Sequence, residues 1–404
     1  MSARLSPLLP VTLLFAACVA YEGDDASPQR IHDELAERAG GSYSFADAAS
    51  LALRQNPELR AAEARARAAG AAATVPLPVI GEWRGRNEAV GAMLDPIALL
   101  GLGPRGAAMQ AADARAAQAA TALAVARWRT LAELAEVFRL HRVAEELRPP
   151  ELGALDADAY EQAGLASEVA AAMLRAADAR ARAEQVELDR LRADQLARLR
   201  HLLGLPAGAV VELLHEDDPV GPIDGELPEL LSRPDVTLAA ARFEVADREF
   251  RRAVAAQYPS LQLGPNVSLR GDPLRAMAML NVPLGMQGLA EAARERREAA
   301  RHDIEDALLE ARREAQVADA ARLAALATDE TAQAMLAARR AAFVAASAAV
   351  EVEPDAFQRY AGAAGEYAEA AADRRRAAAA LAVADVRHAV AYGWPQPSQQ
   401  EENQ

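Results

Sequence analysis

The sequence predicts a mainly α-helical protein with a small β part, in which long antiparallel coiled-coil helices and β-hairpins occur in two tandem repeats. Composition is the first reason, because 52% of the 404 residues are hydrophobic while only 4% are aromatic, and alanine makes up the difference. The second reason is stretches such as residues 111–147, which contain no Gly, Pro or Asn and therefore favour helix. The third is a pattern of residues that occurs twice along the chain.

Residues 1–17 predict a signal peptide of the lipoprotein type. An apolar stretch from Leu8 to Ala17 follows one early positive charge, and it is too short to span a bilayer as a helix. The sequence Phe-Ala-Ala-Cys that ends at Cys18 resembles a bacterial lipobox, so we expect this single cysteine to be lipidated, with palmitate as a candidate acyl group. The alternative is ordinary cleavage after Ala20, which would discard Cys18. Both alternatives predict export.

Two segments, residues 44–70 and 226–260, share one pattern at an offset of 177 positions, since Pro57 corresponds to Pro234. An acidic residue follows each proline, and both residue types suit the first turn of a helix. The expected division of the chain is a first repeat at 18–220, a second repeat at 221–393 and a polar tail at 394–404.

Each repeat is expected to contain one β-hairpin, at about residues 74–101 and 260–285. In the second hairpin, apolar residues alternate on both sides of a Gly-Asp-Pro turn, which is the period of a strand. In the first hairpin the signal is weaker, because three prolines interrupt it. The alternating residues are Val75, Leu77, Val79, Val90, Ala92 and Leu94 in the first, and Leu261, Leu263, Val267, Leu269, Ala278, Leu280, Val282 and Leu284 in the second.

Each repeat is also expected to contain a helical hairpin, at residues 106–203 and 288–392. A helix from residue 288 to about 350 would be roughly 90 Å long at 1.5 Å per residue. Pro149 and Pro150 predict a broken or shortened first coil, because proline removes a hydrogen bond and clashes with the preceding turn. Apolar residues at three- and four-residue spacing predict a narrow seam for a neighbouring helix: Leu131, Leu134, Phe138, Ile304, Leu308, Ala311 and Ala315.

The glycines Gly101, Gly103 and Gly106 have the G-x-G-x-x-G spacing of a dinucleotide-binding loop. Such a loop needs a following strand that carries an acidic ribose ligand about 20 residues later. Residues 107–148 contain no strand signal. The sequence therefore argues against a dinucleotide, and we expect no cofactor.

The charge pattern excludes further classes of function. The formal net charge is -15, and all 44 basic residues are Arg, which disfavours a nucleic-acid partner because phosphate binding needs a net basic surface. The six His residues are scattered, with no His pair at the four-residue spacing of a helical metal site, so no metal site is expected. Since no nucleophile motif or phosphate loop is present, we do not expect an enzyme.

Several motifs resemble the TolC-type outer-membrane efflux protein family, and the resemblance covers nearly all of the mature sequence. That family opens its repeats on Asn-Pro-x-Leu or Arg-Pro-Asp-Leu, and this chain has Asn-Pro-Glu-Leu at 56–59 and Arg-Pro-Asp-Val at 233–236. Tyr-Pro-Ser-Leu at 258–261 and Leu-Leu-Gly-Leu-Pro at 202–206 are similar to further family signatures. Residues 95–109 resemble the heavy-metal efflux branch, which is a hint about cargo.

The resemblance implies a homotrimer in which each protomer gives strands to an outer-membrane β-barrel and long helices to a periplasmic α-barrel. The implied function is a passive exit duct of a tripartite efflux or export system. The implied location is the outer membrane of a Gram-negative bacterium, with a lipid anchor and an extension into the periplasm. The implied partners are a periplasmic adaptor protein, an inner-membrane transporter of the resistance-nodulation-division type, and outer-membrane lipid.

The resemblance also implies where the functional residues lie. Gly164 is expected to end one helix at the periplasmic tip, and Ser167 to begin the next. The expected tip and adaptor-docking residues are Gly164, Leu165, Ser167 and Val352, and the expected barrel-to-helix junction contains Gly101, Gly103, Gly106, Gly285 and Gly288. Glu351, Glu353 and Asp355 are candidate pore acids, since threefold symmetry turns an inward acid into a ring that attracts cations. The alternative for these acids is a solvated turn.

The alternative function is a periplasmic coiled-coil adaptor, or a structural lipoprotein without a pore. Such a protein would also be exported, alanine-rich and helical. An adaptor predicts one helical hairpin flanked by β-rich domains, whereas this sequence predicts two helical hairpins and little other β structure. The sequence therefore favours the channel.

Overall fold

A computed structural model describes residues 27–73, 80–84, 89–93, 103–150, 152, 156–215, 219–220, 230–268, 275–283, 285–350, 353 and 356–394. The described part is mostly helical with few strands, which confirms the predicted fold class at this level. Some predicted functional residues lie outside it, namely Cys18, Gly101, Glu351, Val352 and Asp355.

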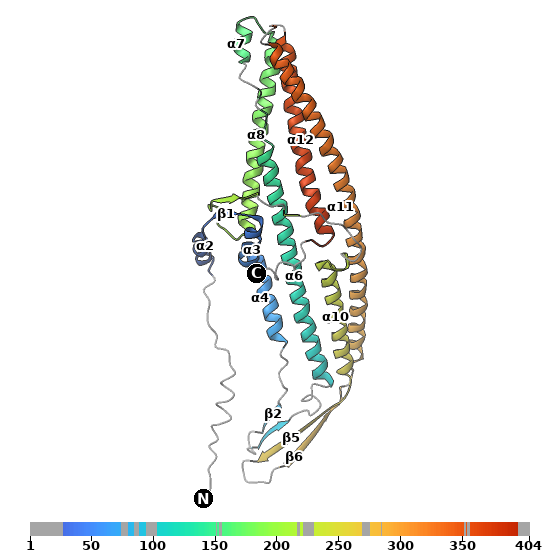
Figure 1. The fold of residues 1–404 in the computed structure, drawn as a ribbon. Helices are drawn as coiled ribbons and strands as arrows, with labels where there is room; N and C mark the ends of the chain where they lie inside the picture. The colour runs from blue at the N-terminus through green and yellow to red at the C-terminus, as the bar shows by residue number, and fades with distance from the viewer. Residues whose placement is uncertain are drawn as a thin grey trace.

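Four long helices form an elongated bundle (Figure 1). They are α6 (Gly103–Glu146), α8 (Glu168–Leu202), α11 (Gln287–Val350) and α12 (Phe357–Ala391). The expected single long helix is confirmed in α11, whose 64 residues span about 96 Å at 1.5 Å per residue. The shorter helices are α2 (Pro28–Ala36), α3 (Phe45–Gln55), α4 (Pro57–Ala72), α7 (Ala157–Gln162) and α10 (Pro234–Ala255).

The helix seams follow the predicted spacing. Leu131, Leu134 and Phe138 of α6 are buried, and so are Ala311 and Ala315 of α11. Small alanine side chains at these positions let neighbouring backbones approach closely, which explains why an alanine-rich chain can pack long helices with few aromatic residues. The predicted shortening is confirmed as well, since α6 ends at Glu146, before the two prolines.

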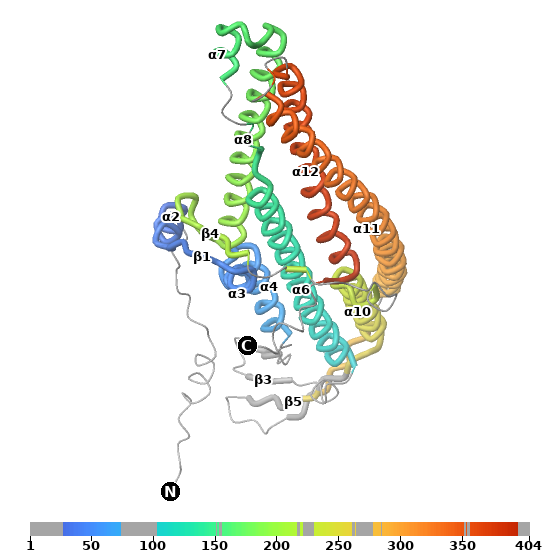
Figure 2. The backbone as a smooth tube through the Cα atoms, turned by 45° about the horizontal axis from the view of Figure 1, so that its top comes forward, coloured from blue at the N-terminus to red at the C-terminus, as the bar shows by residue number. Residues whose placement is uncertain are grey.

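The strands form two separate sheets. β1 (Gly41–Tyr43) pairs in parallel with β4 (Val211–Leu213) beside the middle of the bundle (Figure 2). β2 (Ile80–Arg84), β3 (Ala89–Met93), β5 (Ser260–Ser268) and β6 (Arg275–Asn281) form an antiparallel sheet in that order. This sheet lies at one end of the bundle and α7 at the other (Figure 1). The expected strand from Val75 to Val79 lies outside the described residues, and β2 begins directly after it.

Two helix starts contact the ends of helices that return to the middle of the bundle. At the start of α4, Asn56 donates from Nδ2 to the Leu202 carbonyl at the end of α8, at 3.0 Å. At the start of α10, Arg233 donates from Nη1 to the Ala391 carbonyl at the end of α12, also at 3.0 Å. Each returning helix is followed by a glycine with positive φ, +63° at Gly204 and +89° at Gly393. These two contacts hold the four helix ends together at one level of the bundle.

A hydrophobic core surrounds this level. Apolar residues of α3, α6, α8 and β4 pack together there, including Ala52, Leu134, Leu199 and Val211. Farther along the bundle, a second core joins α7, α8 and α12. Among the described helices, none carries an apolar stretch long enough to cross a bilayer.

Candidate functional site: the strand–helix junction and the helical tip

The junction between the sheet and α6 is built on Gly103 and Pro104. Gly103 has φ of +64°, a conformation that favours glycine, and proline directly after it suits the first turn of the helix. Gly106 lies within the first turn of α6 and is buried, so the chain turns at Gly103 rather than at Gly106. At the start of α11, Gly285 has φ of +81°, and Gly288 is the second residue of the helix.

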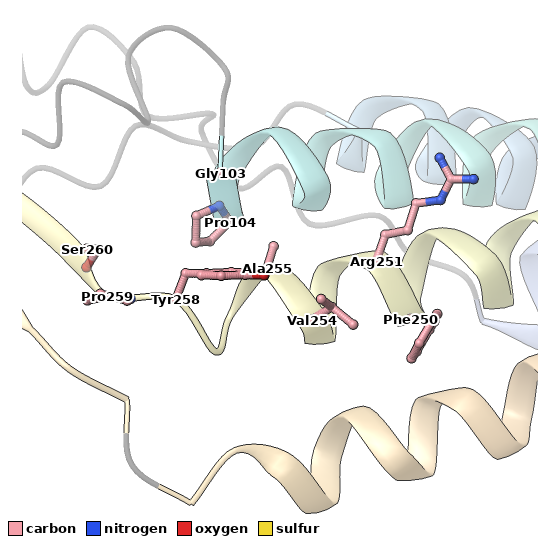
Figure 3. Close-up of a pocket in the computed structure, with 9 residues that line it drawn as sticks. All are labelled: Gly103, Pro104, Phe250, Arg251, Val254, Ala255, Tyr258, Pro259 and Ser260. Atoms are coloured by element: carbon pink, nitrogen blue, oxygen red, sulfur yellow. The ribbon is translucent and has the colours of Figure 1, made fainter.

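A cavity of about 480 Å³ lies at this junction, between the start of α6 and the end of α10. Figure 3 shows Gly103 and Pro104 beside the segment Tyr258–Ser260, through which the chain leaves α10 for β5. Tyr258 is 66% exposed. The cavity wall is mostly apolar, with Phe250 and Val254 contributed by α10. No sequence pattern pointed to this cavity, because its two walls are separated in the chain by the rest of the first repeat and the start of the second.

Charged contacts fix α10 against α11 next to the cavity. Asp247 of α10 is buried and pairs with Arg297 of α11 at 2.7 Å. The same carboxylate accepts from Arg251 at 2.8 Å. The Arg297 guanidinium also lies 5.6 Å from the ring of Phe243 and 5.9 Å from the ring of Phe250. These contacts hold the two helices at a fixed distance where the chain passes into the sheet.

The turn at the far end of the bundle matches its sequence prediction. Gly164 has φ of +70°, and the Leu165 amide donates to the Tyr160 carbonyl at 3.0 Å, which closes the end of α7. Ser167 caps α8, because its Oγ accepts from the Ala170 amide at 3.2 Å. Leu165 between these two caps is 46% exposed. The turn therefore presents an apolar side chain on a fixed backbone.

The turn is held on α12 by aromatic side chains. The Tyr160 ring stacks on the Phe357 ring with centroids 5.0 Å apart. Tyr360 is buried, and its hydroxyl donates to the Leu152 carbonyl. Burial raises the pKa of the Tyr360 phenol above its usual value, which favours the protonated hydroxyl that donates to Leu152. The turn between α7 and α8 is thus attached to the start of α12.

Of the three candidate pore acids, only Glu353 lies within the described residues. It is exposed and accepts from Arg359 at 2.8 Å. A carboxylate paired in this way suits a solvated turn.

Sequence reasoning missed one cluster of polar residues. His141 and Glu145 of α6 and His215 after β4 bring three metal-ligating atoms together, all within 4.8 Å of one another. The sequence search considered pairs of histidines four residues apart, whereas here the pair at that spacing is His141 with a glutamate. His215 joins it only through the fold. The three residues therefore form a group of potential metal ligands that the spacing of the histidines does not show.

No protein-family profile matches the sequence, and no curated protein is similar to it. Solved structures, in contrast, match the fold over nearly the whole chain. CusC, whose structures concern folding and transmembrane channel formation, aligns with a TM-score of 0.69 at 17% identity, over 93% of this chain and 99% of its own. The outer-membrane channel OprN aligns with a TM-score of 0.68 at 17% identity, over 93% and 98% of the two chains. The CmeC outer-membrane channel of Campylobacter jejuni aligns with a TM-score of 0.67 at 16% identity, over 96% and 93%. The chain has the fold of these proteins.

Proposed function

We propose that this chain is the outer-membrane channel of a tripartite efflux or export system and a member of the TolC-type family. The observation that carries the proposal is the four-stranded sheet at one end of a long helical bundle, in a fold shared with outer-membrane channels. A passive duct has no catalytic step, so we propose no enzyme activity.

The register of the sheet supports a membrane-facing strand region. Residues directly opposite one another belong to the same face, and successive residues of a strand belong to opposite faces. Leu261 is opposite Leu280, Leu263 is opposite Ala278, and Val90 is opposite Val267. One face thus collects apolar residues, namely Gly81, Trp83, Val90, Ala92, Leu261, Leu263, Pro265, Val267, Ala276, Ala278 and Leu280.

By the same register, the opposite face contains the charged and amide residues of these strands, namely Glu82, Arg84, Gln262, Asn266, Arg275 and Asn281, together with Ile80, Met93, Met277 and Met279. The charged residues of the four described strands thus all belong to this second face, as expected for strands with lipid on one side and water on the other. On the apolar face, Leu263 is 45% exposed and Leu280 is 64% exposed in the single chain. Exposed apolar residues at these positions support contact with lipid rather than with the chain's own core.

We propose that three copies close this sheet into a barrel. Within the described residues, β2 and β6 each have a neighbouring strand on one side only. In lipid, the free edge of a strand leaves backbone groups without hydrogen bonds, so the edges need further strands from other copies. Large apolar side chains exposed along α11 support the same assembly for the helices, namely Leu309, Val317, Leu323, Met335 and Val344.

The oligomeric state is tested on protein extracted from outer membranes in mild detergent. Native mass spectrometry should give three times the mass of the mature chain. Monomers alone in this extract would contradict the trimer, and recovery of the protein only in fractions without outer membrane would contradict the location.

We further propose that the turn around Leu165 docks a periplasmic adaptor, which in turn connects to an inner-membrane transporter. The support is an exposed apolar side chain between two well-formed helix caps. Leu165→Ser should weaken cross-linking to a periplasmic adaptor that co-purifies with the wild-type protein. Val186→Ser is the matched control, because Val186 is 68% exposed on α8 but lies five turns of helix away from the turn. Equal cross-linking by the two variants would remove the docking role.

The acids Glu351, Glu353 and Asp355, between α11 and α12, stay candidates for a ring that attracts cations in the trimer.

The lipid anchor at Cys18 is part of the same proposal. Labelling of growing cells with a palmitate analogue should mark the wild-type protein, whereas Cys18→Ser should be exported without label. Cys18 is the single cysteine, so the assay has no second acceptor thiol. Unchanged labelling of Cys18→Ser would remove the anchor from the proposal.

A further inference from the structure

We propose that His141, Glu145 and His215 form a binding site for a divalent transition-metal ion of the zinc class. The site lies in the middle of the bundle, away from the four-stranded sheet at one end and from α7 at the other. The proposal does not depend on the channel function. His141 and Glu145 lie one helical turn apart on α6, and His215 lies two residues after the end of β4.

The distances between the three ligand atoms fit one ion. His141 Nδ1 lies 3.1 Å from His215 Nε2, which lies 3.2 Å from Glu145 Oε2. The distance from His141 Nδ1 to Glu145 Oε1 is 3.9 Å. Ligand atoms that surround zinc tetrahedrally, each about 2.1 Å from the ion, are roughly 3.4 Å from one another. The two carboxylate distances belong to different oxygens of Glu145, and with one ligand atom taken from each residue the three atoms lie within 4.8 Å of one another. The two histidine nitrogens are thus close to the tetrahedral spacing, and rotation of the carboxylate brings one oxygen toward both.

The surroundings of the cluster keep its imidazoles available. His141 is buried and His215 is largely buried, and desolvation lowers the pKa of both rings. A neutral imidazole is the form that binds a metal. The two facing ring nitrogens lie at hydrogen-bond distance, and for an ion to bind both of them the donor ring would carry its proton on its other nitrogen, which keeps both rings neutral. The Glu145 side chain is 48% exposed, which gives the ion access to water for a remaining coordination position.

Two arginines lie near the His141–Glu145–His215 cluster, and each donates to a neighbouring carboxylate. Arg192 of α8 donates to the Ala144 carbonyl at 2.6 Å and to Asp189 at 3.3 Å. Arg142 donates to Glu146 at 2.7 Å. Both cations raise the potential at the histidines, and a neighbouring carboxylate partly offsets each of them. Two neutral rings and one carboxylate give the site a charge of -1, which a divalent ion reverses.

The donor set decides the class of ion. Imidazole nitrogen suits Zn²⁺, Cu²⁺ and Ni²⁺, whereas Ca²⁺ and Mg²⁺ prefer sites made of oxygen atoms alone. A bound ion would connect α6 to the segment after β4, where the Phe138 ring already packs edge-on against the His215 ring with centroids 6.3 Å apart. The site would therefore fasten the small β1–β4 sheet to the long bundle.

The test is a titration of the purified full-length mature protein with Zn²⁺, using an affinity tag that contains no histidine. Isothermal titration should find one site per chain, and the midpoint of thermal unfolding should rise with Zn²⁺ and return when a chelator is added. His215→Gln should lower the affinity at least about 100-fold, because loss of a ligand costs no less than loss of its supporting contacts. Glu145→Gln should also weaken binding, and Ca²⁺ should produce no shift.

His302→Gln is the matched control, because His302 lies between Glu298 and Glu305 on the exposed surface of α11 and belongs to no group of potential metal ligands in the part of the chain that the structure describes. This variant should bind Zn²⁺ as the wild type does. If His215→Gln does not fold, Glu145→Gln decides the matter, since that side chain is half exposed and its replacement has almost the same shape. Zn²⁺ binding that survives both variants, or the absence of a stoichiometric site in the wild type, would show that the cluster is a hydrogen-bonded histidine pair only.

Discussion

The starts of α4 and α10 occupy corresponding places in the two halves of the chain, yet they use different chemistry. Each consists of a polar residue followed by proline, and each reaches the last carbonyls of a returning helix. At the first start the polar residue is Asn56, and at the second it is Arg233. The same contact is thus made once by a neutral amide and once by a cation.

Asn56 completes its hydrogen bonds locally. It is 3% exposed, its Oδ1 accepts from the amides of Glu58 and Leu59, and its Nδ2 donates to Leu202. An amide group has two donor hydrogens and one acceptor oxygen, so these contacts satisfy most of its capacity. The start of α4 is therefore both capped and connected to α8 by one small side chain.

Arg233 cannot cap its helix, and α10 has no side-chain cap. Its side chain is 2% exposed and donates at 2.6 Å to Asp235 and at 2.7 Å to Glu314 of α11, besides the Ala391 carbonyl. Its guanidinium also lies 5.5 Å from the centroid of the Trp128 ring on α6. A guanidinium has five donors in a fixed plane, so it can join several elements at once. The start of α10 therefore connects four helices, α6, α10, α11 and α12, whereas the start of α4 connects α4 to α8.

The largest effect is expected from Arg233→Met, which should lower the free energy of unfolding by about 3 to 4 kcal/mol. The substitution leaves the Ala391 carbonyl without this donor and two carboxylates without their cation. Both carboxylates are partly exposed, so water compensates for part of the loss. Chemical denaturation at fixed protein concentration in detergent measures it. Arg233→Lys should lower the free energy of unfolding by less, because lysine keeps the charge but lacks the planar guanidinium. A loss under about 1 kcal/mol for Arg233→Met would show that this side chain does not hold the four helices together.

A smaller loss, about 2 to 3 kcal/mol, is expected from Gly204→Ala, next to the first start. Gly204 has φ of +63°, and an added Cβ would lie 2.6 Å from the Gln55 carbonyl oxygen. Conformational strain and a backbone clash therefore add. Denaturation under the same conditions measures the loss, and an unchanged midpoint would show that the backbone near Gln55 can move away without cost.

Asn56→Ala should cost about 2 kcal/mol, from a lost helix cap and a buried carbonyl without its donor. Asn56→Asp separates the two contributions, because its carboxylate can accept from the two amides but cannot donate to Leu202. We expect it to recover about half of the loss. A variant as unstable as Asn56→Ala would mean that the cap contributes nothing at this helix start.

The smallest effect is expected from Gly164→Ala at the tip, about 1 kcal/mol. Its φ of +70° is as unfavourable for alanine as that of Gly204, but an added Cβ would meet no atom within 4 Å. The difference between the two glycine variants therefore isolates the clash with Gln55. Equal losses at Gly204 and Gly164 would assign the whole effect to backbone conformation.

Local sequence signals predicted the elements better than the contacts between them. Proline after Asn56 and Arg233 marked both helix starts, Gly164 and Ser167 marked the turn between α7 and α8, and Pro149 marked the shortened coil. Each of these depends on backbone geometry within a few residues, which a residue type can report by itself.

The sequence could not reveal contacts that join distant segments. Arg233 looked like part of a family signature, and nothing near it in the chain indicates Glu314 or Trp128 as partners. His215 likewise lies 74 residues from His141 and meets it only because β4 packs against α6. The spacing of the histidines alone could not indicate the cluster, because the two ligands one helical turn apart are a histidine and a glutamate, His141 and Glu145.

The most direct test of the account is the conductance of the purified protein in planar lipid bilayers. If two β-hairpins per chain line a shared bore, trimers should insert and give discrete current steps of uniform size, and Arg233→Met should insert less often without changing the step size. A protein that folds as a monomer and gives no current steps, in bilayers where a reference channel conducts, would contradict the account.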